Sequence, residues 1–338
     1  MASAIRKLSL LWLVAMLWWG SALIGGCSKK IVDGWPKRIP KGVTFTPKSF
    51  EPVDFVDFFQ KAGQTGGVVS WAGDWNELGD TVDGAPKVVA ELAPEYALIP
   101  MVEAQFFTQS TGQLLKPLTE ETKQSYKQMA AAFAKKYQLK FLALGIEVNI
   151  LWEKSPPDFD LFVPFFADVY DTVKAVSPDT KVFTVFQLEK MKGLSGGLFG
   201  GTNDTNNAEW ELLNRFPKSD LIAFTTYPSL VFGNPSEIPT DYYAEVKSHT
   251  SKQIAFTEIG WHSSASPAGW ESSEAEQAEF VQRFFNLTRG LDEEMAVWSF
   301  MYDQNTGEPF NSMGLLQGDG TTKPAWHTWV QANPEKGE

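Results

Sequence analysis

The chain has 338 residues, of which 41 are Asp or Glu and 29 are Lys or Arg, so its formal net charge is −12. Its 43% hydrophobic and 14% aromatic residues, with a single cysteine, exclude a disordered chain, a collagen-like repeat and a small disulfide scaffold. The acidic balance argues against a nucleic-acid partner, because binding to phosphates requires a basic face.

The N-terminal segment has the pattern of an export signal. Arg6 and Lys7 precede an apolar run over residues 8–26, which ends at Cys27. A basic head, an apolar middle and small residues at the end are typical of a secretory signal, and residues 23–27 resemble a bacterial lipobox, in which the cysteine is lipidated. We therefore expect a lipoprotein signal peptide over residues 1–26, a tether over 27–41 and an exported protein held at a membrane of the cell envelope through Cys27. The alternative is a single transmembrane anchor, since the apolar run is nearly long enough to span a bilayer.

Beyond the tether, apolar runs of strand length alternate with amphipathic runs of helix length. The predicted strand–helix pairs are 43–46 with 52–62, 67–71 with 86–93, 97–102 with 120–137, 141–147 with 159–176, 181–186 with 208–216, 221–226 with 241–249, 254–258 with 273–290 and 296–300 with 324–330. Such alternation favours parallel strands with right-handed crossovers. The pattern predicts an α/β fold, a single-domain (β/α)8 TIM barrel over residues 42–332, followed by a tail over 333–338. An open doubly wound sheet is the alternative, although no glycine-rich phosphate motif follows the first strand.

Two glutamates end apolar strands on opposite sides of the predicted ring. Glu147 closes the fourth strand and Glu258 the seventh, and the carboxyl ends of barrel strands form the working face. A carboxylate in such a place is costly unless it is paired, hydrogen-bonded or wet. Two of them facing each other suit glycoside hydrolysis, where one carboxyl protonates the leaving oxygen and the other attacks the anomeric carbon. Repulsion and desolvation would raise one pKa and keep the acid protonated. The alternative is that both glutamates only cap strand ends by pairing with loop lysines or arginines.

This layout resembles the glycoside hydrolases of clan A, retaining (β/α)8 enzymes with an acid/base Glu after strand four and a nucleophile Glu after strand seven. The resemblance covers about residues 42–332 and is architectural more than sequence-specific. It implies that Glu147 is the acid/base and Glu258 the nucleophile, that Tyr227 hydrogen-bonds the nucleophile, and that Trp298 forms the floor of a sugar subsite.

One position departs from that pattern. Clan members usually carry an Asn directly before the acid/base, where it binds the sugar 2-hydroxyl, and here that position is Ile146. Asn149 is a candidate to replace it, because residues two apart share a face of a strand, and otherwise it is an ordinary loop residue.

Further residues at strand ends are candidates for binding a sugar. Trp71, Trp261 and Gln187 follow or end predicted strands. Flat aromatic rings stack on pyranose faces, but the same rings also fill barrel cores, so each Trp has both interpretations. Strand ends also carry Glu103 with Gln105, and Glu189 after Gln187.

The sequence thus predicts a retaining glycoside hydrolase that acts on a β-linked poly- or oligosaccharide at the cell envelope. Retention requires carboxyl groups about 5–5.5 Å apart. We expect a monomer. We also expect no cofactor, because we find no ligand pattern for zinc, iron or calcium. One alternative is a non-catalytic carbohydrate-binding lipoprotein with a degenerate cleft, which Ile146 motivates. Another is the solute-binding lipoprotein of an importer, although the eight-unit pattern gives no second lobe.

Overall fold

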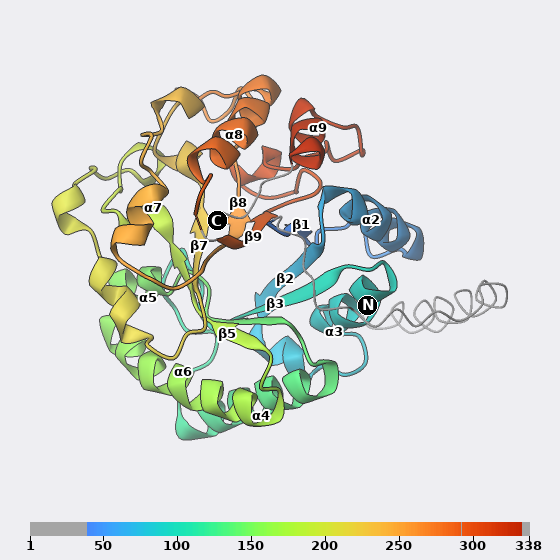
Figure 1. Ribbon diagram of the computed structural model, residues 1–338, viewed down its shortest axis with the longest axis vertical. Coiled ribbons are helices and arrows are strands. Elements are labelled where there is room, and N and C mark those ends of the chain that lie inside the picture. The colour runs from blue at the N-terminus through green and yellow to red at the C-terminus, as the bar shows by residue number, and fades with distance from the viewer. Residues whose placement is uncertain (1–38, 292, 333–338) are drawn as a thin grey trace.

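The computed structural model describes residues 39–291 and 293–332, in which helices surround a ring of parallel strands (Figure 1). The nine strands form one sheet in the order β5-β4-β3-β2-β1-β9-β8-β7-β6. β5 and β6 are two halves of one barrel strand, because only Thr184 separates them, and its hydroxyl donates to the Gly145 carbonyl at 3.2 Å. The predicted (β/α)8 barrel is therefore confirmed.

The strand bounds differ from the predicted ones by a few residues. β1 begins at Lys41, so the last residue of the predicted tether belongs to the barrel. The last strand begins at Glu293, three residues before the predicted start, because two adjacent glutamates at its lower end gave no apolar signal. The strands are β1 (Lys41–Thr44), β2 (Val68–Asp74), β3 (Ile99–Gln105), β4 (Phe141–Leu144), β5 (Lys181–Phe183), β6 (Val185–Gln187), β7 (Ile222–Thr226), β8 (Ile254–Ile259) and β9 (Glu293–Trp298).

Helices follow most strands, and side-chain caps begin α4, α7 and α8. The Thr119 hydroxyl accepts the Thr122 N–H at 3.2 Å, which satisfies one free donor and starts α4 where the sequence predicted it. The α-helices are α2 (Pro52–Thr65), α3 (Ala85–Glu95), α4 (Glu120–Tyr137), α5 (Val148–Lys154), α6 (Pro156–Val176), α7 (Leu188–Met191), α8 (Glu274–Leu287) and α9 (Pro324–Gln331).

Two predicted α-helices, 208–216 and 241–249, are wrong in type. The structure has 3-10 helices at Trp210–Arg215 and Ala244–Ser248. Their backbones close i→i+3 bonds, as from His249 N–H to the Val246 carbonyl at 3.0 Å. Segments this short are compatible with the tighter turn.

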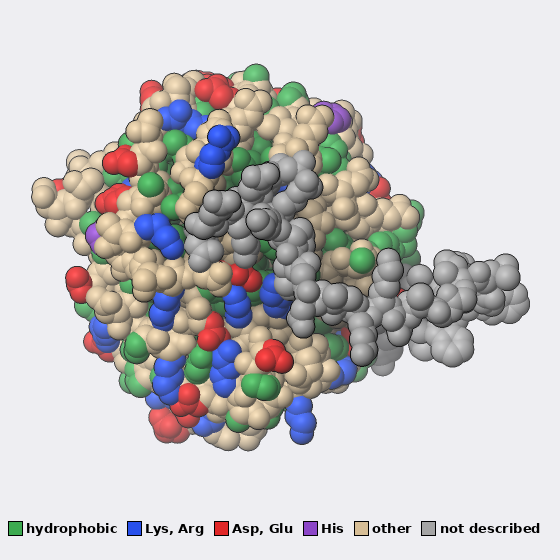
Figure 2. All heavy atoms as spheres, in the orientation of Figure 1, with side chains coloured by type: hydrophobic (Ala, Val, Ile, Leu, Met, Phe, Trp, Pro, Cys, Tyr) green, Lys and Arg blue, Asp and Glu red, His purple; other side chains and the backbone are tan. Residues whose placement is uncertain are grey.

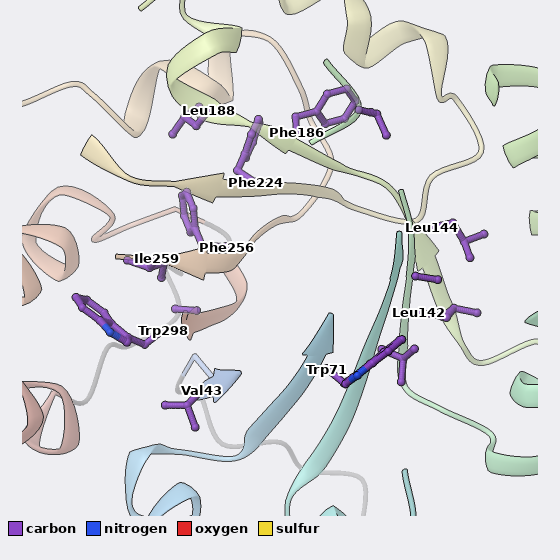
Figure 3. Packing of buried hydrophobic residues seen from close by; sticks show 14 of the residues in the cluster. Val43, Trp71, Leu142, Leu144, Phe186, Leu188, Phe224, Phe256, Ile259 and Trp298 are labelled. Carbon is purple, nitrogen blue, oxygen red and sulfur yellow. The ribbon is translucent and has the colours of Figure 1, made fainter. Parts of the chain in front are cut away.

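The core has two layers because successive side chains of a strand point to opposite faces. Small and branched residues fill the lumen, including Val68, Ala143 and Val297. A larger, aromatic-rich cluster lies between the strands and the helices, and Figure 3 shows Trp71 and Trp298 within it. Each strand thus divides its residues between the lumen and this outer layer, and the division decides which side chains reach the cleft.

The predicted signal peptide over residues 1–26, Cys27, the tether before residue 39 and the tail over 333–338 lie outside the described residues. Within the described ranges, none of the helices has the length and hydropathy needed to cross a bilayer. On the face seen in Figure 2, basic and acidic side chains are interspersed. Ion pairs link neighbouring helices, for example Lys127 of α4 with Asp168 of α6 at 2.7 Å.

Candidate active site

A strained turn after β4 aims Glu147 at the mouth of the barrel. Gly145 has a φ of 81°, and a Cβ there would lie 2.7 Å from a methyl group of Val148. Glu147 itself has a φ of 58°, a left-handed conformation that costs a non-glycine residue about 1 kcal/mol or more. Gln105 holds the turn by donating from Nε2 to the Ile146 carbonyl at 2.9 Å. The local backbone is therefore fixed in a conformation that the chain would not adopt by itself.

A bulge in β8 directs Glu258 to the lumen. Phe224 of β7 pairs with Phe256, but the next residue, Thr225, pairs with Glu258, so Thr257 is an extra residue in the ladder. Under strict alternation Glu258 would share the outer face with Phe256. The additional residue reverses that phase, as bulges next to functional sites often do.

Hydroxyl groups contact both carboxyls. The Thr225 hydroxyl donates to Glu147 Oε1 at 2.7 Å. The Tyr227 hydroxyl donates to Glu258 Oε2 at 2.5 Å, and Ser299 Oγ donates to the Tyr227 oxygen at 2.8 Å. Tyr227 therefore lies where the clan A resemblance implies, with its hydroxyl held against Glu258. Among the described residues neither glutamate forms an ion pair, so strand-end pairing with a Lys or Arg does not explain them.

Burial raises the pKa of both carboxyls. Burial, and then the neighbouring charge of Glu258, raise the pKa of Glu147 to about 8, while the hydrogen bond from Thr225 opposes the shift. Burial also raises the pKa of Glu258, while the hydrogen bond from Tyr227 opposes the shift. Glu147 is therefore largely protonated at neutral pH, and each of the two carboxyls has one hydroxyl donor that stabilises its anion.

A third carboxyl, Glu103 of β3, lies buried in the lumen. Ser70 Oγ donates to its Oε1 at 2.6 Å, and its Oε2 has no hydrogen-bond partner within the described ranges. Burial, and then the charge of Glu258, raise its pKa to about 8. Three carboxyls with raised pKa values, those of Glu103, Glu147 and Glu258, are therefore close enough to influence one another.

Glu147 and Glu258 line one open cleft of about 500 Å³. Of the predicted binding residues, Tyr227 and Gln187 also line it. The other lining residues are Gln109, Ser110, Ile150, Glu153, Lys154, Lys190, Phe199, Leu230, Phe300 and Phe310. Apart from Tyr227, the aromatic residues that line the cleft are therefore phenylalanines, which the sequence reasoning missed.

The predicted tryptophan subsites are wrong for the described structure. Trp71, Trp261 and Trp298 are at most 5% exposed and belong to the outer hydrophobic cluster. Trp298 Nε1 donates to the Met313 carbonyl at 2.8 Å, and Trp261 Nε1 donates to Ser272 Oγ at 3.0 Å. Strand alternation is the reason for two of them: Ser70 and Val297 point into the lumen, so Trp71 and Trp298, the next residues, point outward.

Asn149 is a structural residue and does not replace the missing Asn. It is 1% exposed in α5, where its Nδ2 donates to the Gln187 carbonyl at 3.0 Å and its Oδ1 accepts the Gln187 N–H at 2.8 Å. Ile146, at the expected Asn position, packs in the lumen cluster. Asn149 therefore fixes the backbone of Gln187, and only Gln187 reaches the cleft.

Glu189, a buried carboxylate beside the cleft, is fully engaged. The hydroxyls of Thr226 and Tyr242 each donate to its Oε1 at 2.8 Å, and the Tyr227 N–H donates to its Oε2 at 3.2 Å. Burial raises its pKa. Its role is to join α7 to the end of β7. Within the described ranges, no group of three or more His, Cys, Asp or Glu is arranged to hold a metal ion.

No family model and no curated protein matches the sequence, whereas solved structures match the fold. A family 39 glycoside hydrolase from Bacteroides cellulosilyticus WH2 has a TM-score of 0.63 at 18% identity, with 87% of this chain and 63% of that chain covered. The exo-β-1,4-mannosidase Op5Man5 from Opitutaceae bacterium strain TAV5 has a TM-score of 0.60 at 15% identity, with 87% and 59% covered. A family 5 glycoside hydrolase from Streptomyces cattleya, solved with Manβ1-4GlcNAc, has a TM-score of 0.63 at 16% identity, with 87% and 79% covered.

These matches confirm the resemblance to the glycoside hydrolase barrel at the level of the fold. The chain spans about three fifths of the length of the first two proteins. At such low identity the likeness extends to the barrel and not to the reaction.

Proposed function

We propose that this protein is a retaining glycoside hydrolase that cleaves a β-linked poly- or oligosaccharide, with Glu147 as acid/base and Glu258 as nucleophile. The observation that carries the proposal is that these two carboxyls, from opposite sides of the ring, line one cleft, and that within the described ranges neither pairs with a cation. In the proposal Glu147, whose pKa burial raises to about 8, supplies the proton, and Glu258, which accepts the Tyr227 hydroxyl, is the attacking carboxylate.

The proposed reaction has two steps. Glu258 attacks the anomeric carbon while the glycosidic C–O bond breaks, and Glu147 gives its proton to the leaving oxygen. The product of this step is a glycosyl ester on Glu258. Glu147, now a carboxylate, removes a proton from water, which attacks the same carbon and releases Glu258. Tyr227 donates to Glu258 in the resting state and so holds the attacking oxygens in place.

We also propose that the protein is exported and anchored to a membrane of the cell envelope through a lipid on Cys27. The basic, apolar and small-residue pattern of residues 6–27 supports this. Labelling of cells with a radioactive or clickable fatty acid tests it: the wild type takes up label and Cys27→Ala does not. Equal labelling of both proteins contradicts the lipid anchor.

Hydrolysis is tested with a panel of aryl β-glycosides and β-linked polysaccharides, comparing the wild type with Glu258→Ala. We expect turnover only in the wild type, with the first product carrying the β-anomeric configuration in an NMR time course. If the wild type and Glu258→Ala show the same activity on every substrate of the panel, the hydrolase proposal is wrong. If the first product has the α-anomeric configuration, the protein is still a glycoside hydrolase, but the two-step retaining mechanism is contradicted.

A non-catalytic carbohydrate-binding protein is the second candidate, and Ile146 is the observation that favours it. Its apolar side chain stands where clan A enzymes are expected to bind the sugar 2-hydroxyl, and it is buried in the lumen. Loss of that hydrogen bond removes stabilisation of the transition state but not of the bound sugar. Binding that persists in Glu147→Gln and Glu258→Ala, with no turnover by the wild type, supports this candidate.

A further inference from the structure

One wall of the cleft carries two lysines that the reaction proposed above does not use. Lys154 ends α5 and Lys190 lies in α7, and both line the cleft together with the two glutamates. No other Lys or Arg among the described residues lines it. Three glutamates also line the cleft, and of these it is Glu153 that lies beside the two lysines.

The two lysines share a single counter-ion. Lys154 Nζ lies 3.0 Å from Glu153 Oε1, and Lys190 Nζ lies 3.3 Å from Glu153 Oε2. One carboxylate between two ammonium groups leaves this wall with an excess positive charge. Glu209, a further carboxyl near Lys190 and Glu153, does not remove that excess fully, because burial raises its pKa to about 7.

Lys190 is held over the cleft instead of extending into solvent. Its side chain is only 16% exposed, and its Nζ lies 4.8 Å from the centre of the Phe199 ring and 3.2 Å from Ser195 Oγ. A lysine at a helix C-terminus interacts favourably with the helix dipole even when its side chain is exposed. The helix dipole therefore does not explain why Lys190 is held against Phe199 and Ser195. The ring and the ammonium group together form an apolar face next to a positive charge.

We infer that the cleft binds a sugar chain that carries an anionic substituent, which Lys190 and Lys154 receive while the sugar ring lies against Phe199. This rests on the proposed carbohydrate function and names its substrate class. The lysines follow β4 and β6, whereas Glu258 comes from β8, which lies two strands beyond β6 in the ring. The negative substituent thus meets the positive wall and not the nucleophile. A uronate carboxylate and a sulfate ester have this chemistry in common.

The experiment measures binding without turnover. Glu258→Ala in the full chain is titrated calorimetrically with matched pairs of oligosaccharides: oligomannuronate with mannohexaose, oligoglucuronate with cellohexaose, and a sulfated cello-oligosaccharide with its neutral parent. We expect at least one anionic sugar to bind about tenfold more tightly than its neutral counterpart at low salt, with the preference shrinking as salt is added. The uronate and sulfate arms identify the source of the negative charge.

Two kinds of variant should change the preference for anionic sugars in opposite directions. In the same background, Lys190→Gln and Lys154→Gln are expected to reduce the anionic preference, and Glu153→Gln to increase it, because the shared counter-ion is removed. Lys218→Gln is the matched control, since Lys218 pairs with Asp171 on the surface and outside the cleft lining. No preference for any anionic sugar, or a preference that the Lys190 and Lys154 variants leave unchanged, overturns the inference.

Failure of the proposed hydrolysis is a separate outcome. One outcome is that the wild type cleaves no substrate and still prefers anionic sugars, with the lysine variants reducing that preference and Glu153→Gln increasing it. That result supports the anionic subsite and contradicts the hydrolase. If the wild type cleaves neutral sugars and binds anionic ones no better, the hydrolase stands and the subsite does not.

Discussion

Glutamates at the two ends of the barrel have opposite surroundings. At the lower end, where the strands begin, the Glu294 carboxylate lies 3.5 Å from Lys140 Nζ and 3.1 Å from Lys181 Nζ. At the upper end, where the strands finish, Glu147 and Glu258 receive hydrogen bonds from the hydroxyls of Thr225 and Tyr227. Glu294 at the lower end is thus paired with two lysines, whereas Glu147 and Glu258 at the upper end receive hydrogen bonds from uncharged hydroxyls.

The difference between the two ends affects protonation. An ion pair across the lower opening joins β9 to the starts of β4 and β5 and favours the ionised carboxylate. At the upper end, burial and the charge of Glu258 raise the pKa of Glu147 to about 8, because a single hydroxyl compensates less for lost hydration. The carboxyl of Glu147 therefore lowers stability as pH rises from about 4.5 to about 8, and under the proposed function it supplies the proton near neutrality.

Replacing the proton donor gives the largest expected effect. Glu147→Gln removes the proton from the leaving group, and we expect kcat on an unactivated oligosaccharide to fall about 10² to 10⁴-fold. An aryl glycoside with an acidic leaving phenol needs less protonation, so its loss should be much smaller. The alkaline limb of the pH–rate profile, near pH 8 in the wild type, should disappear. Equal losses on both substrates, or an unchanged alkaline limb, would show that Glu147 is not the acid.

At the lower end, the corresponding change should affect stability and not turnover. Glu294→Gln removes the carboxylate that Lys140 and Lys181 share, and Glu294 is only 5% exposed. We expect the free energy of unfolding to fall by about 1–3 kcal/mol, with kcat unchanged.

The matched control for Glu294 is Glu120→Gln, which removes an exposed partner of Lys123 and should cost about 0.5 kcal/mol or less. Urea denaturation of the three proteins measures both values. A Glu294 variant as stable as the control, or one that loses turnover, would contradict the division between the two ends.

The barrel and the meeting of Glu147, Glu258 and Tyr227 in one cleft could be predicted from the sequence. Parallel strands place their carboxyl ends at one face, so a count of strand–helix pairs already brings strands four and seven opposite each other. The start of α4 could also be predicted from the sequence, because threonine is a favoured N-cap residue and Thr119 directly precedes the helix.

The direction of individual side chains could not be predicted, because it depends on the phase of each strand. A single residue of shift exchanges the lumen for the outer layer. Trp298 lies in the outer cluster because Val297 points to the lumen. Phe300 lies beyond the end of β9, where strand alternation no longer applies, and it reaches the cleft. The bulge at Thr257 reverses the phase of β8 without a Gly or Pro to mark it. Phe199 and Phe310 lie in single-turn 3-10 helices, Gly197–Phe199 and Phe310–Ser312, which are too short for a hydrophobic period to reveal them in the sequence.

Weakening the hydrogen bond to Glu258 should move the acid limb of the pH–rate profile. Tyr227→Phe removes the donor to Oε2, so the pKa of Glu258 should rise further and the acid limb should shift to higher pH. We expect kcat/KM at pH 6 to fall about tenfold, with a smaller loss at pH 7.5. Ser299→Ala is the matched control, because Ser299 contacts Glu258 only through Tyr227. A loss that is the same at every pH would mean that Tyr227 supports the cleft without affecting ionisation.

Glu293, the neighbour of Glu294 at the lower end, should make stability depend on pH. It is fully buried, neither carboxyl oxygen is hydrogen-bonded within the described ranges, and burial raises its pKa to about 8. From the ordinary value of 4.5 up to about 8, the folded protein keeps a proton that the unfolded chain has lost, so stability falls as pH rises through this window. Glu293→Gln cannot ionise and escapes that loss. We expect the variant and the wild type to be similarly stable at pH 5 and the variant to be more stable at pH 8, by at most about 4 kcal/mol for a shift of this size. Denaturation at the two pH values measures this, and a variant that is less stable at pH 8 would mean that Glu293 is ionised and paired, like Glu294 beside it.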